Sequence, residues 1–109
     1  LSSMAAHRVV PGGGLYGATK YAVRALTESL RQELHAAGSA IRVGSVSPGI
    51  IETGFGADFF GGDEKAREIW DRVTPLQAAD VADAVRYLLD QPPHVQIHDV
   101  LVRPTKQAL

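Results

Sequence analysis

The sequence has no cysteine, no long apolar run and no excess of charge of either sign. Without cysteine, neither a disulfide framework nor a thiolate zinc site can form. No run of apolar residues approaches the ~20 that a membrane-spanning helix needs, and no segment has the pattern of a signal peptide. We therefore expect a cytoplasmic protein with no membrane partner.

Charge and histidine content exclude two further kinds of site. The 11 basic and 12 acidic residues give a net charge of −1, and the basic residues are scattered along the chain. This distribution predicts no nucleic-acid partner. His94 and His98 are four residues apart, but they follow two prolines and enter an expected strand, so they should not share a face. We therefore expect no metal site.

The remaining pattern alternates between helix and strand. The spacing of apolar residues predicts a helix over 14–36, a strand over 41–47, helices over 63–73 and 78–90, and a final strand over 95–103. This order corresponds to half of an α/β unit. The low charge of the first strand suits a parallel sheet that helices cover on both faces.

The expected 14–36 helix is amphipathic, and such a helix buries its apolar row. The apolar row consists of Ala22, Leu26, Leu30 and Leu34. The opposite row consists of Arg24, Glu28, Arg31 and His35. We expect this second row to be either solvated or a contact between subunits. Gly38 is placed to end the helix in the left-handed conformation.

Residues 50–62 place three phenylalanines among four glycines. Phe55, Phe59 and Phe60 in such a segment suggest a mobile flap over a pocket, and a buried loop anchor is the alternative. Asp63 is the expected N-cap of the next helix. Finally, Trp70 and Tyr87 are expected to be packing residues, and Leu89 is expected to face inward on the 78–90 helix.

Tyr16 and Lys20 carry the clearest chemical signal. They are four residues apart in the first expected helix, so their side chains project from one face. A free tyrosine titrates near ~10, and lowering its pKa by about 3 units takes roughly 4 kcal/mol. A cation about 4 Å away supplies an energy of this order at an effective dielectric constant of about 20. Lys20 alone therefore comes close to making Tyr16 a usable acid/base, and a second positive charge nearby would complete the shift. With Ser3 upstream, this geometry suits proton transfer to or from a hydroxyl or carbonyl oxygen.

Other interpretations remain open at this stage. A Tyr and a Lys at this spacing also occur on the solvated face of any long helix. The 12–17 segment satisfies G-x-G-x-x-G, but the apolar run before it is too short for a core strand and ends in Pro11. Ser45 and Ser47 have no G-x-S-x-G elbow around them, which argues against a hydrolase. His7 lies near Ser3 and could edge a pocket.

Several motifs occur together in one order: Ser2 and Ser3, Pro11, the run YGATK at 16–20, and the run SPGIIET at 47–53. Together they resemble the C-terminal half of the short-chain dehydrogenase/reductase family. The resemblance implies a Rossmann-like, doubly wound parallel sheet. Residues 1–109 would then be the catalytic and substrate-binding half of one such domain. The first residue is leucine, so we expect a fragment that lacks the N-terminal dinucleotide-binding half.

The resemblance also implies roles for individual residues. Tyr16 would be the acid/base, Lys20 would lower its pKa and hold the nicotinamide ribose, and Ser3 would donate to the substrate oxygen. The loop beside the nicotinamide would comprise Pro48, Gly49, Ile51 and Thr53, with the Ile51 backbone and the Thr53 hydroxyl as polar contacts. One position departs from the family pattern, because Ala6 stands where the family often has glycine.

The implied activity is hydride transfer between a nicotinamide cofactor and a small-molecule alcohol or carbonyl substrate. The tail over 94–105 resembles a branch with NADP-dependent 3-hydroxy acid (serine-type) dehydrogenases and carbonyl reductases. NADP is therefore expected in preference to NAD, and the complete protein is expected to form a homodimer or homotetramer. The competing hypothesis is a catalytically inactive fragment, or an interaction module that keeps the second half of the fold.

Overall fold

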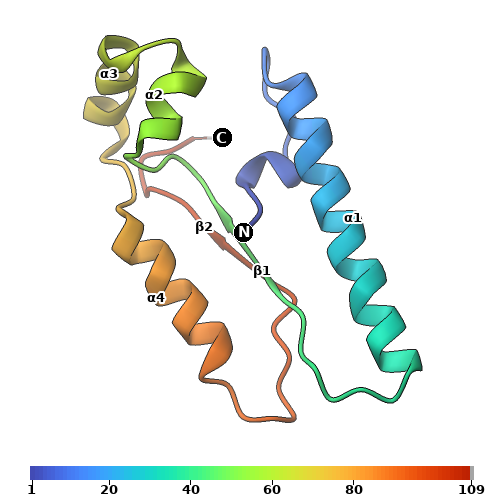
Figure 1. The fold of residues 1–109 in the computed structure, drawn as a ribbon. Helices are drawn as coiled ribbons and strands as arrows, with labels where there is room; N and C mark the ends of the chain where they lie inside the picture. The colour runs from blue at the N-terminus through green and yellow to red at the C-terminus, as the bar shows by residue number, and fades with distance from the viewer. Residues whose placement is uncertain (109) are drawn as a thin grey trace.

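The computed structural model describes residues 1–108 and contains seven helices and strands (Figure 1). In chain order these are the 3₁₀ turn η1 (Met4–Ala6), α1 (Gly14–Ala36), β1 (Ser45–Pro48), α2 (Gly54–Phe60), α3 (Asp63–Val73), α4 (Ala78–Leu89) and β2 (Asp99–Val102). The expected helices over 14–36, 63–73 and 78–90 are confirmed within one residue. No helix in residues 1–108 is long and apolar enough to cross a membrane.

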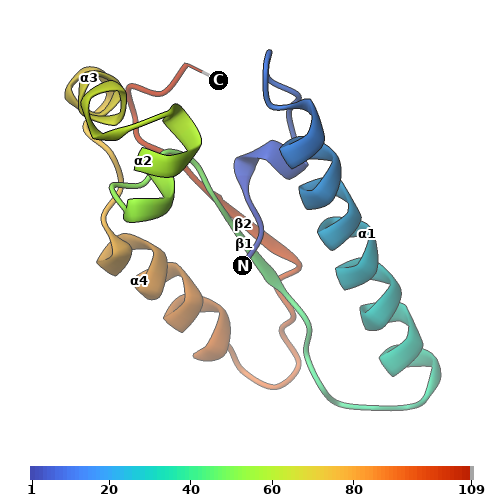
Figure 2. The same cartoon turned by 45° about the horizontal axis from the view of Figure 1, so that its top comes forward.

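The two strands form a parallel pair at the centre of the molecule. Ser45 pairs with Asp99, and the register continues to Pro48 with Val102. On the other side of β1, the Ser2 N–H donates to the Val46 carbonyl at 2.8 Å. In Figures 1 and 2, α1 lies on one side of the strands and α2, α3 and α4 lie on the other. The α/β class with parallel strands is therefore confirmed.

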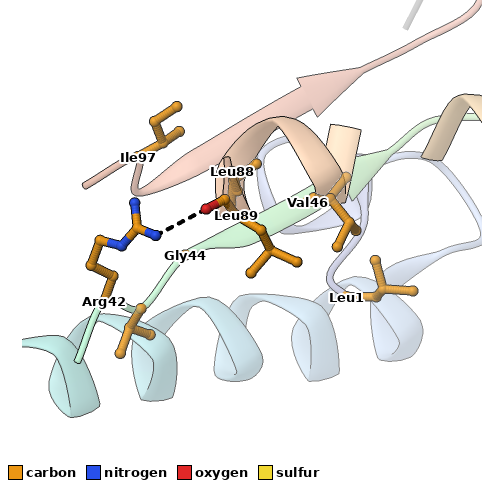
Figure 3. Close-up of a pocket in the computed structure, with 9 residues that line it drawn as sticks. Leu1, Arg42, Gly44, Val46, Leu88, Leu89 and Ile97 are labelled. Carbon is orange, nitrogen blue, oxygen red and sulfur yellow. Dashed lines mark hydrogen bonds between the residues drawn. The ribbon is translucent and has the colours of Figure 1, made fainter. Parts of the chain in front are cut away.

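Alternation along β1 separates a polar face from an apolar face. Ser45 and Ser47 bond Asp99 on one face, whereas Val46, only 3% exposed, points toward α4 on the other. Figure 3 shows Val46 in an apolar hollow with Leu88 of α4 and Ile97. The α4-facing side of β1 thus packs against apolar side chains of α4 and of the segment before β2.

Both strands are shorter than the spacing predicts, because side chains bond the carbonyls that a longer ladder would use. The Arg42 guanidinium donates to the Val95 carbonyl at 3.1 Å. The Gln96 amide donates to the Val43 carbonyl, also at 3.1 Å. The segments before residues 45 and 99 therefore run alongside each other without the regular strand pattern.

The environment of α1 differs from the expectation for its apolar row. Leu26 is 69% exposed and Leu30 is 48% exposed, so the apolar row is not buried by residues 1–108. Arg24 is exposed overall, but its guanidinium reaches the η1 turn and donates from Nη1 to the Ala6 carbonyl at 3.3 Å. The reason is that α1 packs mainly on η1, and η1 in turn packs on β1. The polar row stays largely solvated, as one of its two expected roles requires: Arg24 and His35 are exposed, and Glu28 and Arg31 are partly exposed.

The 50–62 segment also differs from the expected loop, because it contains the helix α2. Thr53 is its extended N-cap, and Gly61 ends it in the left-handed conformation with φ 87°. Gly56 allows α2 to approach Trp70 of α3, since a Cβ at Gly56 would lie 3.2 Å from the indole. Trp70 therefore packs as expected.

Three smaller expectations are wrong and one is confirmed. Gly62, not Asp63, is the N-cap of α3. On α4, Tyr87 is 56% exposed and Leu89 is 68% exposed, so neither packs inward within the described chain. Gly38 follows the end of α1 with φ 67°, the left-handed conformation that its position predicts.

Candidate functional site

The residues that the sequence singles out line one cavity of about 440 Å³. Ser3, Tyr16 and Lys20 border it from η1 and α1. The loop after β1 borders it from the opposite side with Pro48, Gly49, Ile51 and Thr53. All seven candidate residues are therefore brought together, although they come from segments separated by up to 50 positions of the chain.

Ser3 is held as the N-cap of η1. Its Oγ accepts a hydrogen bond from the Ala5 backbone N–H at 3.1 Å. The hydroxyl hydrogen is not used in that bond, so it remains available for a further acceptor. Ser3 can thus donate toward the cavity while its oxygen is fixed by the backbone.

Tyr16 and Lys20 lie one turn apart on α1, and both side chains are half-buried. The Lys20 Nζ is 5.6 Å from the centroid of the Tyr16 ring. Gly17 is buried against η1, where a Cβ would lie 3.6 Å from the Ala5 carbonyl oxygen, at ordinary van der Waals distance. This packing of α1 on η1 brings the tyrosine and the serine to the same cavity.

An aromatic wall, defined here as Phe55, Phe59 and Phe60, covers one side of the cavity. The Tyr16 ring centroid lies 5.8 Å from that of Phe55 and 5.1 Å from that of Phe59. Phe55 and Phe59 are 58% and 42% exposed, so their faces are open to a ligand. The sequence correctly indicates aromatics over a pocket, but they are carried by a helix.

The loop after β1 is fixed by bonds to the C-terminal segment. The Gly49 N–H donates to the Val102 carbonyl at 2.7 Å, and the Ile50 N–H donates to Gln107 Oε1 at 3.0 Å. A Cβ at Gly49 would clash with the Gln107 side chain, so a larger residue there would displace Gln107 Oε1 from its bond to the Ile50 N–H. Gln107 is a site residue that the sequence analysis misses, since nothing in its local pattern distinguishes it.

Two residues of this loop that line the cavity, Ile51 and Thr53, each have a polar group without a hydrogen bond in residues 1–108. The flanking Ile50 carbonyl and Glu52 N–H both bond Leu76, whereas the N–H of Ile51 has no acceptor within residues 1–108. The Thr53 hydroxyl makes no capping bond to α2. Together with Lys20, these two groups provide three hydrogen-bond donors at residues that line the cavity.

His7 does not edge the cavity. Its ring lies on the polar face of the strands, where Nε2 is 2.7 Å from Asp99 Oδ2 and 3.2 Å from Ser47 Oγ. The glycine-rich 12–17 segment follows no strand, so it lacks the context of a dinucleotide-binding turn. Across residues 1–108, no three His, Asp or Glu side chains gather as a metal site.

Known proteins resemble this chain over nearly its full length. The chain is 49% identical over 110 residues to Dehydrogenase/reductase SDR family member 11 from Gallus gallus, which covers 98% of the chain. It is 37% identical over 109 residues to Serine 3-dehydrogenase from Rhizobium radiobacter, which covers 99%. In both cases the chain spans 43% of the relative's length.

Solved structures give the same result. A closed form of serine dehydrogenase complexed with NADP+ superimposes with a TM-score of 0.89 at 35% identity, covering 99% of this chain and 44% of that one. An alcohol dehydrogenase from the archaeon Thermococcus sibiricus, complexed with 5-hydroxy-NADP, superimposes with a TM-score of 0.77 at 29% identity. The match covers 99% of this chain and 41% of that one.

The family model described as Enoyl-(Acyl carrier protein) reductase matches residues 1–94. The chain therefore belongs to the short-chain dehydrogenase/reductase family.

Proposed function

We propose that residues 1–109 form the catalytic, C-terminal half of a nicotinamide-dependent enzyme that interconverts an alcohol and a carbonyl compound. The observation that carries the proposal is the convergence of Ser3, Tyr16 and Lys20 on one cavity with the loop over 48–53. The dinucleotide-binding half would be supplied by a preceding segment, because the chain spans only 43% of its relatives.

Each of the three residues has a distinct role. In the reducing direction, the Ser3 hydroxyl donates to the substrate oxygen, because its own oxygen is already bonded to the Ala5 N–H. Tyr16 delivers a proton to the same oxygen. Lys20 stabilises negative charge on the phenolic oxygen from the next turn of α1.

A bound nicotinamide cofactor would supply or accept the hydride. We propose NADP in preference to NAD, since two structural relatives are described in complex with NADP+ or 5-hydroxy-NADP. The Ile51 N–H and the Thr53 hydroxyl would bond the nicotinamide end, and Lys20 would bond the ribose. The unused donors at 51 and 53 support this assignment.

The lining of the cavity favours an apolar carbonyl substrate. Among the residues described, Lys20 is the only charged side chain at the cavity, and three phenylalanines face it. A substrate carboxylate would need a second cation for recognition, because Lys20 already serves Tyr16 and the ribose. Aromatic or aliphatic ketones and aldehydes are therefore the expected substrates, together with their alcohols.

Tyr16→Phe tests the proposed chemistry in the full reading frame that contains these residues. Turnover should fall by at least about 10²-fold, the usual contribution of a general acid–base group. Cofactor affinity, measured by nicotinamide fluorescence, should stay unchanged. Tyr21→Phe is the matched control, because Tyr21 lies on the same helix but does not line the cavity. Full activity in Tyr16→Phe contradicts the proposal.

The alternative is an inactive fragment or an interaction module. Comparing the short chain with the full reading frame distinguishes this alternative from the enzyme. Cofactor binding and turnover are measured for residues 1–109 and for the full reading frame. Activity only in a longer form supports an enzyme whose other half is needed. A folded full reading frame with neither property supports the module.

We also propose that the complete protein is a homodimer or homotetramer with a cytoplasmic location. The exposed apolar row of α1, with Leu26 and Leu30, supports a contact of this kind. Light scattering of the full reading frame measures the mass. A monomer at all concentrations contradicts the oligomer.

A further inference from the structure

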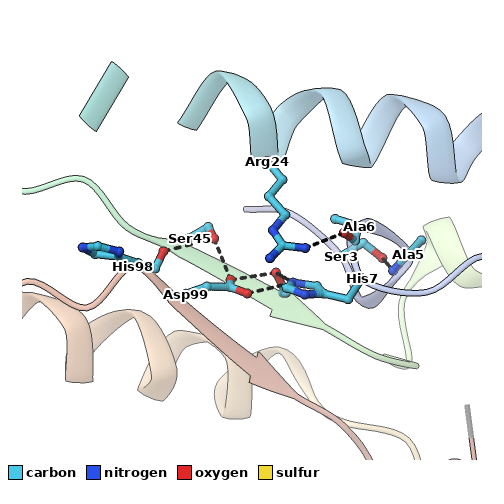
Figure 4. Close-up of polar contacts among 9 residues, drawn as sticks. Ser3, Ala5, Ala6, His7, Arg24, Ser45, His98 and Asp99 are labelled. Carbon is cyan, nitrogen blue, oxygen red and sulfur yellow. Dashed lines mark hydrogen bonds and ion pairs between the residues drawn. The ribbon is translucent and has the colours of Figure 1, made fainter. Parts of the chain in front are cut away.

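A polar cluster lies on the α1-facing side of the strands and is formed by His7, Ser45, Ser47 and Asp99 (Figure 4). Asp99 Oδ1 accepts from the Ser45 hydroxyl at 2.6 Å and from the Ser47 hydroxyl at 2.8 Å. Asp99 Oδ2 lies 2.7 Å from His7 Nε2. The cluster therefore joins β1, β2 and the residue that follows η1.

The direction of these bonds follows from chemistry. An ionised carboxylate only accepts, so His7 Nε2 must carry the hydrogen that bonds Asp99. The side chains of His7 and Asp99 are 19% and 25% exposed, and Ser47 is 1% exposed. Hydrogen bonds to a charged group in such shelter are stronger than neutral bonds at the surface. The His7–Asp99 hydrogen bond therefore stabilises the position of His7 against β2.

The cluster is not a second catalytic centre. A Ser-His-Asp relay uses the two ring nitrogens of the histidine, one for serine and one for aspartate. Here the same Nε2 lies near both Ser47 and Asp99. Ser47 is also buried, and its hydroxyl already donates to Asp99. The cluster therefore has a structural role, because it links the strands to η1 through His7.

The η1 turn connects this link to the candidate site. Ser3 is its N-cap and His7 is its C-cap, so one short turn separates them. From the opposite side, Arg24 Nη1 donates to the Ala6 carbonyl at 3.3 Å. Figure 4 shows Arg24 reaching down from α1 to the same turn that carries Ser3 and His7. The turn is therefore held by both α1 and the strands.

We propose that His7 and Asp99 are positioning residues that hold Ser3 in register with Tyr16. This inference rests on the function proposed above. The row on α1 that carries Tyr16 and Lys20 continues to Arg24, so the helix fixes one side of η1. The His7–Asp99 bond fixes the other side. Without it, η1 can shift relative to Tyr16, and a 1 Å displacement of a reacting group costs on the order of 10²-fold in rate.

His7→Leu tests the proposal in the full reading frame, since leucine keeps an apolar body of similar size but cannot bond Asp99. We expect kcat for carbonyl reduction to fall about 10- to 100-fold, with cofactor affinity nearly unchanged. His7→Gln retains an N–H donor and should recover most of the loss. Arg8→Leu is the matched control, because Arg8 is exposed and its side chain makes no described hydrogen bond.

The Ser3→Ala background distinguishes positioning from general stability. If His7 acts through Ser3, then Ser3→Ala with His7→Leu should be no slower than Ser3→Ala alone. An equal further loss in that background overturns the proposal, as does full kcat in His7→Leu. Should His7→Leu fail to fold, a folded His7→Gln that loses as much kcat as Ser3→Ala also overturns it.

The outcomes also separate this inference from the proposed function. A dispensable His7 in an enzyme that requires Tyr16 and Ser3 overturns the positioning role alone. Full turnover in Tyr16→Phe overturns the function itself.

Discussion

The side chain of Gln107 ties the loop after β1 to η1. Its Oε1 accepts from the Ile50 N–H at 3.0 Å, and its Nε2 lies 3.0 Å from the Met4 sulfur. Gln107 is 7% exposed, so these bonds are sheltered from water. One residue near the C-terminus therefore connects the proposed nicotinamide loop with the turn that carries Ser3.

Gln107→Ala should loosen this loop. A backbone N–H left unsatisfied in a buried site costs about 1–3 kcal/mol, so we expect a lower free energy of unfolding and weaker cofactor binding. Urea unfolding and nicotinamide fluorescence of the full reading frame measure the two effects. Lys106→Ala is the control, because Lys106 is exposed. Equal affinities in the two variants would contradict the role of Gln107.

Phe59→Ala should widen the cavity and remove its closest ring contact with Tyr16, at 5.1 Å. We expect KM for an aromatic ketone to rise about 10-fold or more, because a buried aromatic contact contributes roughly 1.5–3 kcal/mol. The KM for a small ketone such as acetone should change less. Tyr87→Ala serves as the control, since Tyr87 lies on α4 away from the cavity. A uniform change for both ketones would argue against the aromatic wall as a substrate surface.

The spacing of apolar residues predicted the helices of this fold well where the periodic segment is long. The helices over 14–36 and 63–73 have the expected bounds, because their spacing and flanking glycines are local signals. The order of the motifs along the sequence also predicted the candidate residues that line the cavity. The glycines of α2 concealed a short helix, since its stability depends on packing against Trp70 rather than on propensity.

What the sequence did not reveal depends on contacts between distant segments. The apolar row of α1 was expected to be buried but is largely exposed within residues 1–108, because α1 packs mainly on the η1 turn and not on an apolar layer. The link from His7 to Asp99 joins residues 92 positions apart, and no local pattern connects them. Gln107 likewise meets Ile50 only in the folded chain.

The Glu28–Arg31 pair on α1 predicts a pH dependence. Bidentate hydrogen bonds from Arg31, at 2.6 and 2.7 Å, and a further one from Gln32 lower the pKa of Glu28 from 4.5 to about 2. Since the folded value lies below the unfolded value, the stabilisation is present above pH 4.5 and is lost as the pH falls toward 2.

Arg31→Gln should therefore raise the pKa of Glu28 toward 4.5, as followed by carboxyl NMR of the full reading frame. High salt should have a similar, smaller effect, because the pair is exposed to solvent. Arg86→Gln, on α4, should leave the Glu28 titration unchanged. A Glu28 midpoint that stays near 2 in Arg31→Gln would assign the shift to another cause.

Substitutions of Arg42 and Arg86 allow a comparison of how much each arginine contributes to the free energy of unfolding. The Arg42 guanidinium donates to the carbonyls of Leu89, Gln91 and Val95 at 2.8 to 3.1 Å, so it satisfies the end of α4 and the loop beyond it. Arg42→Ala leaves these acceptors without that donor, and we expect a loss of about 1–3 kcal/mol in the free energy of unfolding.

Arg86 contacts only an exposed carboxylate on its own helix, with 70% of its side chain exposed, so Arg86→Ala should cost about 0–1 kcal/mol. Arg42→Lys should recover little, because an ammonium cannot reproduce the planar fork that reaches several carbonyls at once. Urea unfolding of the three variants in the full reading frame gives the comparison. If Arg42→Ala and Arg86→Ala lose equal stability, the Arg42 guanidinium does not stabilise the end of α4. The C-terminal turn of α4 would then be stabilised by the apolar packing around Val46 and Leu88 instead.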